Sequence, residues 1–140
     1  METHIEFTQD PIEIPALEVF GDETGSAVEF RGIVRATERG ETIGGLYYEA
    51  YLPMARLQLE RIMAQLCETW QCQAVWFVHR LGWVPVGEAS LYVCIHASHR
   101  EPAFRFCMEL IDRLKKDVPV WKLTLPPGSG AEEALPRRSG

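Results

Sequence analysis

The sequence is short of positive charge and has no long apolar run. Its 140 residues contain 14 Lys and Arg against 20 Asp and Glu, which gives a formal net charge of −6. Nucleic-acid-binding domains carry a basic patch or stripe, so we expect no nucleic-acid partner. No stretch reaches the roughly 18 apolar residues that a membrane-spanning helix needs, so we expect no membrane association.

The chain also lacks the marks of export and of a bound metal or cofactor. Its first residues, METHIEFTQDPIEIP, contain neither the basic nor the apolar region of a signal peptide. The four cysteines form no CxxC pair, and His96 and His99 have no carboxylate or thiol at ligand spacing. No dinucleotide fingerprint or phosphate-cradling loop is present. We therefore expect a cytoplasmic protein with buried free thiols, no metal and no cofactor.

Alternation of apolar and polar residues predicts several strands. They are expected at residues 3–8, 26–36, 43–52, 73–80, 88–96 and 120–125. The turn ERGET between the second and third of these predicts that they form a hairpin. Together with two helices, this pattern indicates a single α+β domain, with antiparallel hairpins rather than a doubly wound parallel sheet.

Apolar residues at spacings of three and four predict the two main helices. One opens at Pro53, and the other runs from an N-cap at Ser98 to about Asp117. Their core-facing stripes are expected at Met54, Leu57, Ile62 or Met63, Leu66 and Trp70, and at Phe104, Cys107 or Met108, Ile111 and Leu114. A short helix is expected between Pro15 and Gly21. The domain is expected to cover residues 1–125, followed by a polar, mobile tail at 126–140.

The segment LKKDVPVWK, residues 114–122, gathers ammonium groups beside apolar residues. Lys115 follows the buried stripe at its edge, where its amine can reach a cleft, whereas Lys116 is turned towards solvent. The bend at Pro119 can bring Lys122 back towards Lys115, with Trp121 on the opposite face of the strand. Two converging amines are suited to nucleophilic or proton-transfer chemistry. On the spacing alone, three ordinary surface lysines remain the favoured interpretation.

A second basic group lies at the start of the second long helix. His99 and Arg100 fall in its first turn, where free backbone N–H groups and the helix dipole favour an anion. They indicate a phosphate site, unless they are solvated or paired with Glu101. Arg35 ends an expected strand beside a turn and is a weaker candidate for the same chemistry.

The motifs FRGIVR, LYYEAYLPMA, VHRLGWVPVGEAS, ASHREPAF and IDRLKKDVPVWK resemble, in order and spacing, those of the large, catalytic subunit of molybdopterin synthase, the MoaE family. The resemblance covers roughly residues 25–122. It implies an α/β hammerhead-type fold and a homodimer within a heterotetramer. It also implies a sulfurtransferase that moves two sulfurs to cyclic pyranopterin monophosphate, giving molybdopterin. The sulfur donor would be a small ubiquitin-fold partner whose Gly-Gly tail ends in a thiocarboxylate.

The resemblance also implies roles for single residues. Arg35, His99, Arg100, Lys115 and Lys122 match the family's substrate-binding positions. Lys115 would be the central catalytic group, and Lys122 its electrostatic partner. The pair His99 and Arg100 would hold the substrate phosphate.

The chain departs from the family pattern near these residues. Leu123-Thr124 replaces a basic residue and a glutamate after Lys122, and Ala36-Thr37 replaces a polar, His-containing pair after Arg35. The tail lacks the usual tryptophan, and Arg137 or Arg138 would replace an arginine that some relatives lend across the dimer. These changes keep an alternative open, namely a non-catalytic paralogue that binds the partner or a pterin.

Overall fold

The computed structural model describes residues 1–14, 21–128 and 130, which contain the two predicted long helices and nine strands. The helices are α1 (Leu52–Thr69) and α2 (Arg100–Asp117). The strands are β1 (Glu2–Thr8), β2 (Ser26–Ile33), β3 (Thr37–Glu38), β4 (Glu41–Thr42), β5 (Gly45–Ala50), β6 (Ala74–Arg80), β7 (Gly82–Pro85), β8 (Ala89–Ala97) and β9 (Val120–Leu125). The predicted α+β class is confirmed.

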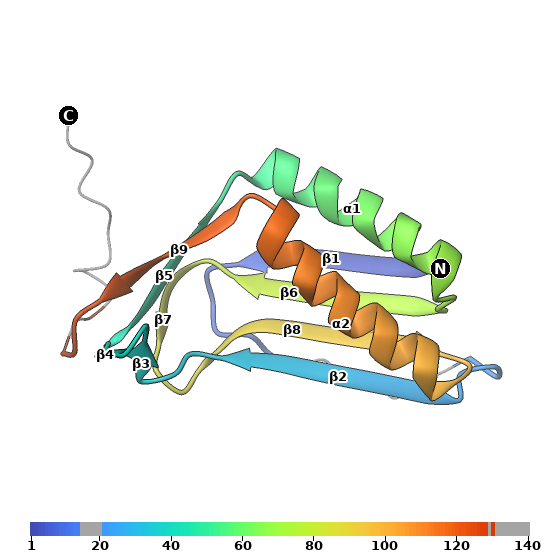
Figure 1. Cartoon of the computed structure of the whole chain (residues 1–140), viewed down its shortest axis with the longest axis horizontal. Helices are drawn as coiled ribbons and strands as arrows, with labels where there is room; N and C mark the ends of the chain where they lie inside the picture. Colours follow the sequence, from blue (N-terminus) through green and yellow to red (C-terminus); the bar gives the residue numbers. More distant parts are fainter. Residues whose placement is uncertain (15–20, 129, 131–140) are drawn as a thin grey trace.

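The main layer is a four-stranded sheet in the order β1–β6–β8–β2, and both helices cover one of its faces (Figure 1). β1 runs parallel to β6, whereas the other neighbours are antiparallel. The side chains alternate between the two faces, as strand geometry requires. Phe77 and Val93 belong to the core shared with the helices, and Tyr92 and Cys94 pack in a separate cluster with Val78.

A smaller sheet in the order β7–β5–β9 lies at the end of the main sheet where α2 stops (Figure 1). β5 is its central strand and pairs antiparallel with both neighbours. Gly45 is required there, because a Cβ at this position would clash with the Trp83 ring and lie 2.6 Å from the Val84 carbonyl oxygen. The register places Lys122 of β9 opposite Tyr48 of β5. This junction of the two sheets with the end of α2 positions the site described below.

The predicted hairpin between residues 26–36 and 43–52 is wrong. β2 pairs with β8 instead, so that Val28 and Phe30 pack against the core formed with the helices. The turn ERGET closes only the two-residue strands β3 and β4. Burial of an apolar face against α2 favours the non-local partner, and a local turn does not outweigh it.

Each predicted helix stripe is partly wrong. Phe104 and Met108 of α2 are 60% and 64% exposed, and Met54 and Leu57 of α1 are exposed as well. The buried positions are Ala55, Leu59, Ile62, Met63 and Leu66 of α1, and Ala103, Phe106, Cys107, Leu110 and Leu114 of α2. The fully buried Ala55 and Ala103 permit close packing in the core, whereas the prediction favoured the bulkier residues beside them.

The predicted N-cap at Ser98 is also wrong. His99 occupies the N-cap position of α2, with extended backbone and no capping hydrogen bond from its side chain. The Ser98 hydroxyl instead accepts a hydrogen bond from Gln73 Nε2 at 2.7 Å. The chain therefore ties Ser98 to the loop before β6, and the helix begins one residue later than expected.

Some predictions fall where the structure gives no description. The helix expected between Pro15 and Gly21 lies almost wholly outside the described residues, as do most of the tail at 126–140 and both Arg137 and Arg138. The boundary of the domain at residue 125 stays a prediction. Within the described part of the chain, neither helix combines the length and the hydrophobicity that crossing a membrane takes.

Candidate active site

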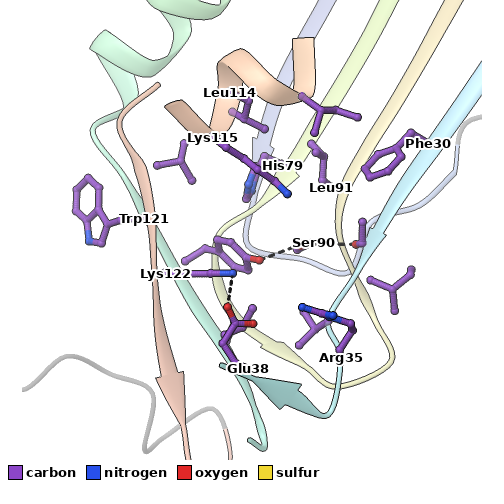
Figure 2. Close-up of a pocket in the computed structure, with 17 residues that line it drawn as sticks. Phe30, Arg35, Glu38, His79, Ser90, Leu91, Leu114, Lys115, Trp121 and Lys122 are labelled. Atoms are coloured by element: carbon purple, nitrogen blue, oxygen red, sulfur yellow. Dashed lines mark hydrogen bonds and ion pairs between the residues drawn. The ribbon is translucent and has the colours of Figure 1, made fainter. Parts of the chain in front are cut away.

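A cavity of about 400 Å³ lies between the last turn of α2, the strand β9 and the loop that follows β2 (Figure 2). Its lining comes from segments far apart in the sequence. The charged side chains in this lining are Arg35, Glu38, Lys115 and Lys122. The fold therefore brings together three of the five residues that the sequence nominates for the site, and it adds an acid.

Arg35 reaches the cavity from a loop that is anchored at both ends. Val34 is buried, and its amide donates to the Glu88 carbonyl at 3.0 Å. Ile43 is buried in the same small cluster, and its amide donates to the Ala36 carbonyl at 2.8 Å. Among the described residues, Arg35 has no partner in a hydrogen bond or ion pair. Its guanidinium is thus held at the rim by the backbone and remains available to an anion.

Lys115 reaches the cavity from the last turn of α2. It follows the buried Leu114 and lies one turn beyond the half-buried Ile111, and all three residues line the cavity. The helix edge thus supplies an apolar wall and an amine together. Lys115 forms no ion pair with any residue that the structure describes. Lys116 is exposed and outside the lining, as predicted.

Lys122 enters from β9 and is already paired. Its Nζ lies 2.9 Å from Oε1 of Glu38, which belongs to β3 (Figure 2). The ring of Trp121 points away from Lys122 on the other side of the strand, as the strand period predicts. Trp121 is 46% exposed and contributes to the cavity rim, while Val120 adds apolar surface.

The remaining polar groups of the lining form a neutral set. The Tyr48 hydroxyl donates to Ser90 Oγ at 3.3 Å, and Ser90 Oγ donates to the Gly32 carbonyl at 3.4 Å. His79 Nδ1 lies 2.8 Å from the Arg80 carbonyl, which can only accept, so Nδ1 carries the proton and Nε2 a lone pair. Burial lowers the pKa of His79, and the hydrogen bond to Arg80 opposes this only in part. His79 is therefore neutral at pH 7.

The other two nominated residues lie elsewhere. His99 and Arg100 are exposed at the start of α2, and Lys115 follows fifteen residues later on the same helix. At 1.5 Å per residue the two groups are separated by about 22 Å. One copy of the chain therefore does not bring the His-Arg pair to the cavity that the lysines line.

Several polar members of the lining were missed from the sequence, among them Glu38 and His79. Glu38 gave no signal, because it lies in a two-residue strand inside a segment that reads as a turn. His79 could have been found, because it lies two residues after Phe77 in a strand that is otherwise apolar on the core side. A histidine on such a face has to be buried with a hydrogen-bond partner, and Arg80 supplies it.

The departures from the family pattern border the cavity without lining it. Leu123 and Thr124 continue β9 beyond Lys122, and neither belongs to the lining. Ala36 and Thr37 lie in the loop between Arg35 and Glu38 and are exposed. The chemistry at the cavity is therefore carried by residues other than these four.

The fold and the cavity define a class of protein, namely a single α+β domain with a cavity lined by lysine and arginine. Within residues 1–14, 21–128 and 130, no three His, Cys, Asp or Glu side chains gather as a metal site would require. The model of the MoaE protein family matches residues 7–117. This chain belongs to that family.

Relatives and solved structures agree with this assignment. The chain is 39% identical over 104 residues to the molybdopterin synthase catalytic subunit of Arabidopsis thaliana, covering 74% of this chain and 52% of that protein. It is 33% identical over 120 residues to the human protein of the same name, covering 84% and 64%. The crystal structure of molybdopterin synthase from Staphylococcus aureus matches with a TM-score of 0.80 and 29% identity, covering 88% and 91%. The chain thus spans about half to two thirds of the length of these two curated relatives.

Proposed function

We propose that this chain is the catalytic subunit of a molybdopterin synthase, a sulfurtransferase of molybdenum cofactor biosynthesis. The observation that carries the proposal is the convergence of Arg35, Lys115 and Lys122 on one cavity in a chain of this family. These are positions that the sequence motifs assign to the site. The names of the plant and human relatives support the same activity.

The chemistry suits this lining. The substrate is cyclic pyranopterin monophosphate, and the sulfur comes from the thiocarboxylate of a partner's Gly-Gly tail. Both reactants are anionic, and sulfur transfer from an acyl group passes through anionic intermediates. Cations that are already in place stabilise such charge without reorganisation. Lys115 is the central catalytic group, because its amine has no partner among the described residues, and Lys122 is its electrostatic partner.

The partner is a small ubiquitin-fold sulfur carrier. The relatives are named as catalytic subunits, which supports the existence of a second subunit. Its tail would pass the rim at Trp121 and meet the two lysines, and two copies of each chain would form a heterotetramer. The cytoplasm stays the expected location.

His99 and Arg100 bind the substrate phosphate from a second copy of the chain. This part of the proposal rests on the separation of about 22 Å along α2, which exceeds the reach of a small substrate. A homodimer with two-fold symmetry would present the helix start of each copy to the cavity of the other. The cavity would then hold the reacting groups, and the neighbouring helix start would hold the phosphate.

The activity is tested with the purified chain, the thiocarboxylated partner and cyclic pyranopterin monophosphate. Mass spectrometry of the products should detect molybdopterin. Binding of the partner or of the pterin without any product would support the alternative, a non-catalytic paralogue.

Shared sites are tested by mixing two impaired variants at a substrate concentration too low for either variant to turn over on its own. Arg100→Ala and Lys115→Ala would be unfolded together, refolded and assayed. If each site draws on both copies, about half of the random dimers contain one copy of each variant, and each of these has one of its two sites intact. The mixture should then recover about a quarter of the wild-type activity. If both groups act within one copy, the mixture should be no more active than the variants alone.

A further inference from the structure

Glu38 is the one carboxylate among the described residues that line the cavity. Its side chain is only 17% exposed, and its Oε1 accepts the hydrogen bond from Lys122 Nζ at 2.9 Å. The two residues come from different elements, β3 and β9, so the pair also ties the loop after β2 to the small sheet. A carboxylate is out of place in a cavity that receives anions, because it repels them. Its presence therefore needs an explanation.

The backbone holds Glu38 in this position independently of Lys122. Glu38 and Glu41 are paired in the β3–β4 hairpin. Arg39 and Gly40 between them both have positive φ, at 50° and 80°, which is the two-residue turn that matches the twist of a hairpin. Ile43 then anchors the end of the hairpin in a buried cluster. The backbone of the hairpin thus fixes the position of the Glu38 carboxylate at the cavity.

The carboxylate is ionised at neutral pH. The hydrogen bond from Lys122 is the largest influence that lowers the pKa of Glu38, and the charges of Lys122, Arg35 and Arg39 lower it further. Desolvation acts in the opposite direction and does not prevail. The charged lining therefore consists of three cations and one anion, with a net charge of two. Arg35 and Lys115 are unpaired within the described structure, whereas Lys122 is neutralised by its partner.

Glu38 affects the binding of an anion in this cavity to a degree that depends on the charge of the anion. Attraction to the three cations and repulsion by Glu38 both grow in proportion to the charge of the ligand. A monoanion that binds between Lys115 and Lys122 is repelled once, and a trianion is repelled about three times as strongly in free energy. Cellular phosphates and nucleotides are polyanions, whereas an acyl carboxylate or thiocarboxylate carries one charge. The placement of the acid therefore affects which anions remain bound.

From this geometry we infer that Glu38 is a specificity-determining residue, which aims Lys122 and biases the cavity towards a monoanionic acyl group and against polyanions. The identity of the acyl group as a partner's thiocarboxylate tail rests on the proposed function. The charge selectivity itself does not, because it concerns binding to this chain alone.

The test uses two probes and no partner. N-acetylglycylglycine presents one carboxylate after two glycines, and inorganic pyrophosphate is a polyanion. Each is titrated into the protein while backbone amide NMR shifts are followed at Lys122 and Ser90 for the cavity. The Arg100 amide reports separately on the start of α2. Binding at each end of the molecule thus yields its own affinity.

Glu38→Gln preserves the size of the side chain and removes its charge. At the cavity we expect pyrophosphate affinity to rise about tenfold or more and N-acetylglycylglycine affinity by about threefold or less, because the Coulomb energy scales with ligand charge. Glu41→Gln is the matched control in the same hairpin, since Glu41 is exposed and outside the lining. It should change either affinity by less than about twofold.

Two results would overturn the inference. Equal gains for the two probes in Glu38→Gln would show that the acid does not discriminate by charge. Equal effects of Glu38→Gln and Glu41→Gln would show a general surface effect. Because neither measurement needs turnover, a chain that fails to make molybdopterin could still show the selectivity, and an active synthase could still lack it.

Discussion

The two ends of α2 both carry basic residues, and they are built in different ways. At its last turn, Lys115 lines one cavity with Arg35, Lys122 and Glu38, which come from segments separated in sequence and joined only by the fold. At its start, Arg100 follows the N-cap residue along the chain and is exposed. One end is an open cavity with partly apolar walls, and the other is a local feature of one helix. Charge beside apolar surface is screened less than charge in open water, so we expect the reaction at the cavity and anion binding at the helix start.

The sharpest test of this contrast is Lys115→Ala. Loss of its amine should reduce product formation by about a hundredfold or more, the range seen when one preorganised stabilising group is removed. The fold should be unaffected, because the side chain is exposed and forms no ion pair in the described structure. The measurement is a single-turnover assay with circular dichroism as a check of folding.

Lys116→Ala is the matched control for that variant. Lys116 has the same charge on the same turn and is also exposed, but it lies outside the cavity lining. It should retain near wild-type turnover. Similar losses in the two variants would mean that the net charge of α2, rather than the cavity, matters for the reaction.

The next largest effect is expected at the other end of the helix. If Arg100 holds the substrate phosphate, Arg100→Ala should weaken substrate binding by about 10- to 100-fold, because a hydrogen bond to a charged group contributes roughly 1.5–3 kcal/mol. Wild-type binding should also weaken as salt rises. Substrate titration of both proteins at low and high ionic strength measures both effects.

The partner's affinity provides the counter-test for Arg100. Its tail is expected at the lysines, so Arg100→Ala should leave partner binding nearly unchanged. If the variant binds substrate like the wild type and loses the partner instead, the His-Arg pair belongs to a protein interface and the phosphate assignment is wrong.

The same contrast explains how much could be predicted from the sequence. Lys115 and Lys122 were found because a helix edge and a strand period are local patterns, and the α+β class followed from the same periodicities. The pairing of β2 with β8 was missed, because strand partners are chosen by burial over the whole domain. Glu38 was missed for the same reason, since its role depends on a contact with β9 and not on its neighbours.

The pH dependence of stability tests whether His79, in the cavity lining, is shielded from water. Burial lowers the pKa of His79 in the folded state, so between its folded and unfolded pKa values the unfolded chain binds more protons. The free energy of unfolding should therefore be greatest above the unfolded value of about 6.5 and should fall as the pH drops below it. Urea unfolding at pH 7.5, 6.5 and 5.5 measures this slope.

His79→Asn should flatten that slope, because asparagine does not titrate and its amide can still donate to the Arg80 carbonyl. Some slope should remain, since burial also lowers the pKa of His96. An unchanged slope in the variant would mean that His79 is hydrated in the folded protein. The cavity would then be wetter than its lining indicates.

The smallest effect is expected at the turn that presents Glu38. Arg39 has φ of 50°, a left-handed conformation that costs a residue with a Cβ roughly 1–2 kcal/mol, whereas Asn tolerates it better. Arg39→Asn creates the Asn-Gly pair that this hairpin turn favours, so it should stabilise the fold by about 0.5–1 kcal/mol.

Arg39→Gln is the control, because it also removes the charge but retains the strained conformation, and it should give no gain. Equal stabilisation by both variants would trace the gain to relief of charge repulsion near Arg35. Charge repulsion, rather than the left-handed backbone at Arg39, would then limit the stability of this part of the fold. Chemical denaturation of the three proteins, followed by the pyrophosphate titration, would separate these two causes.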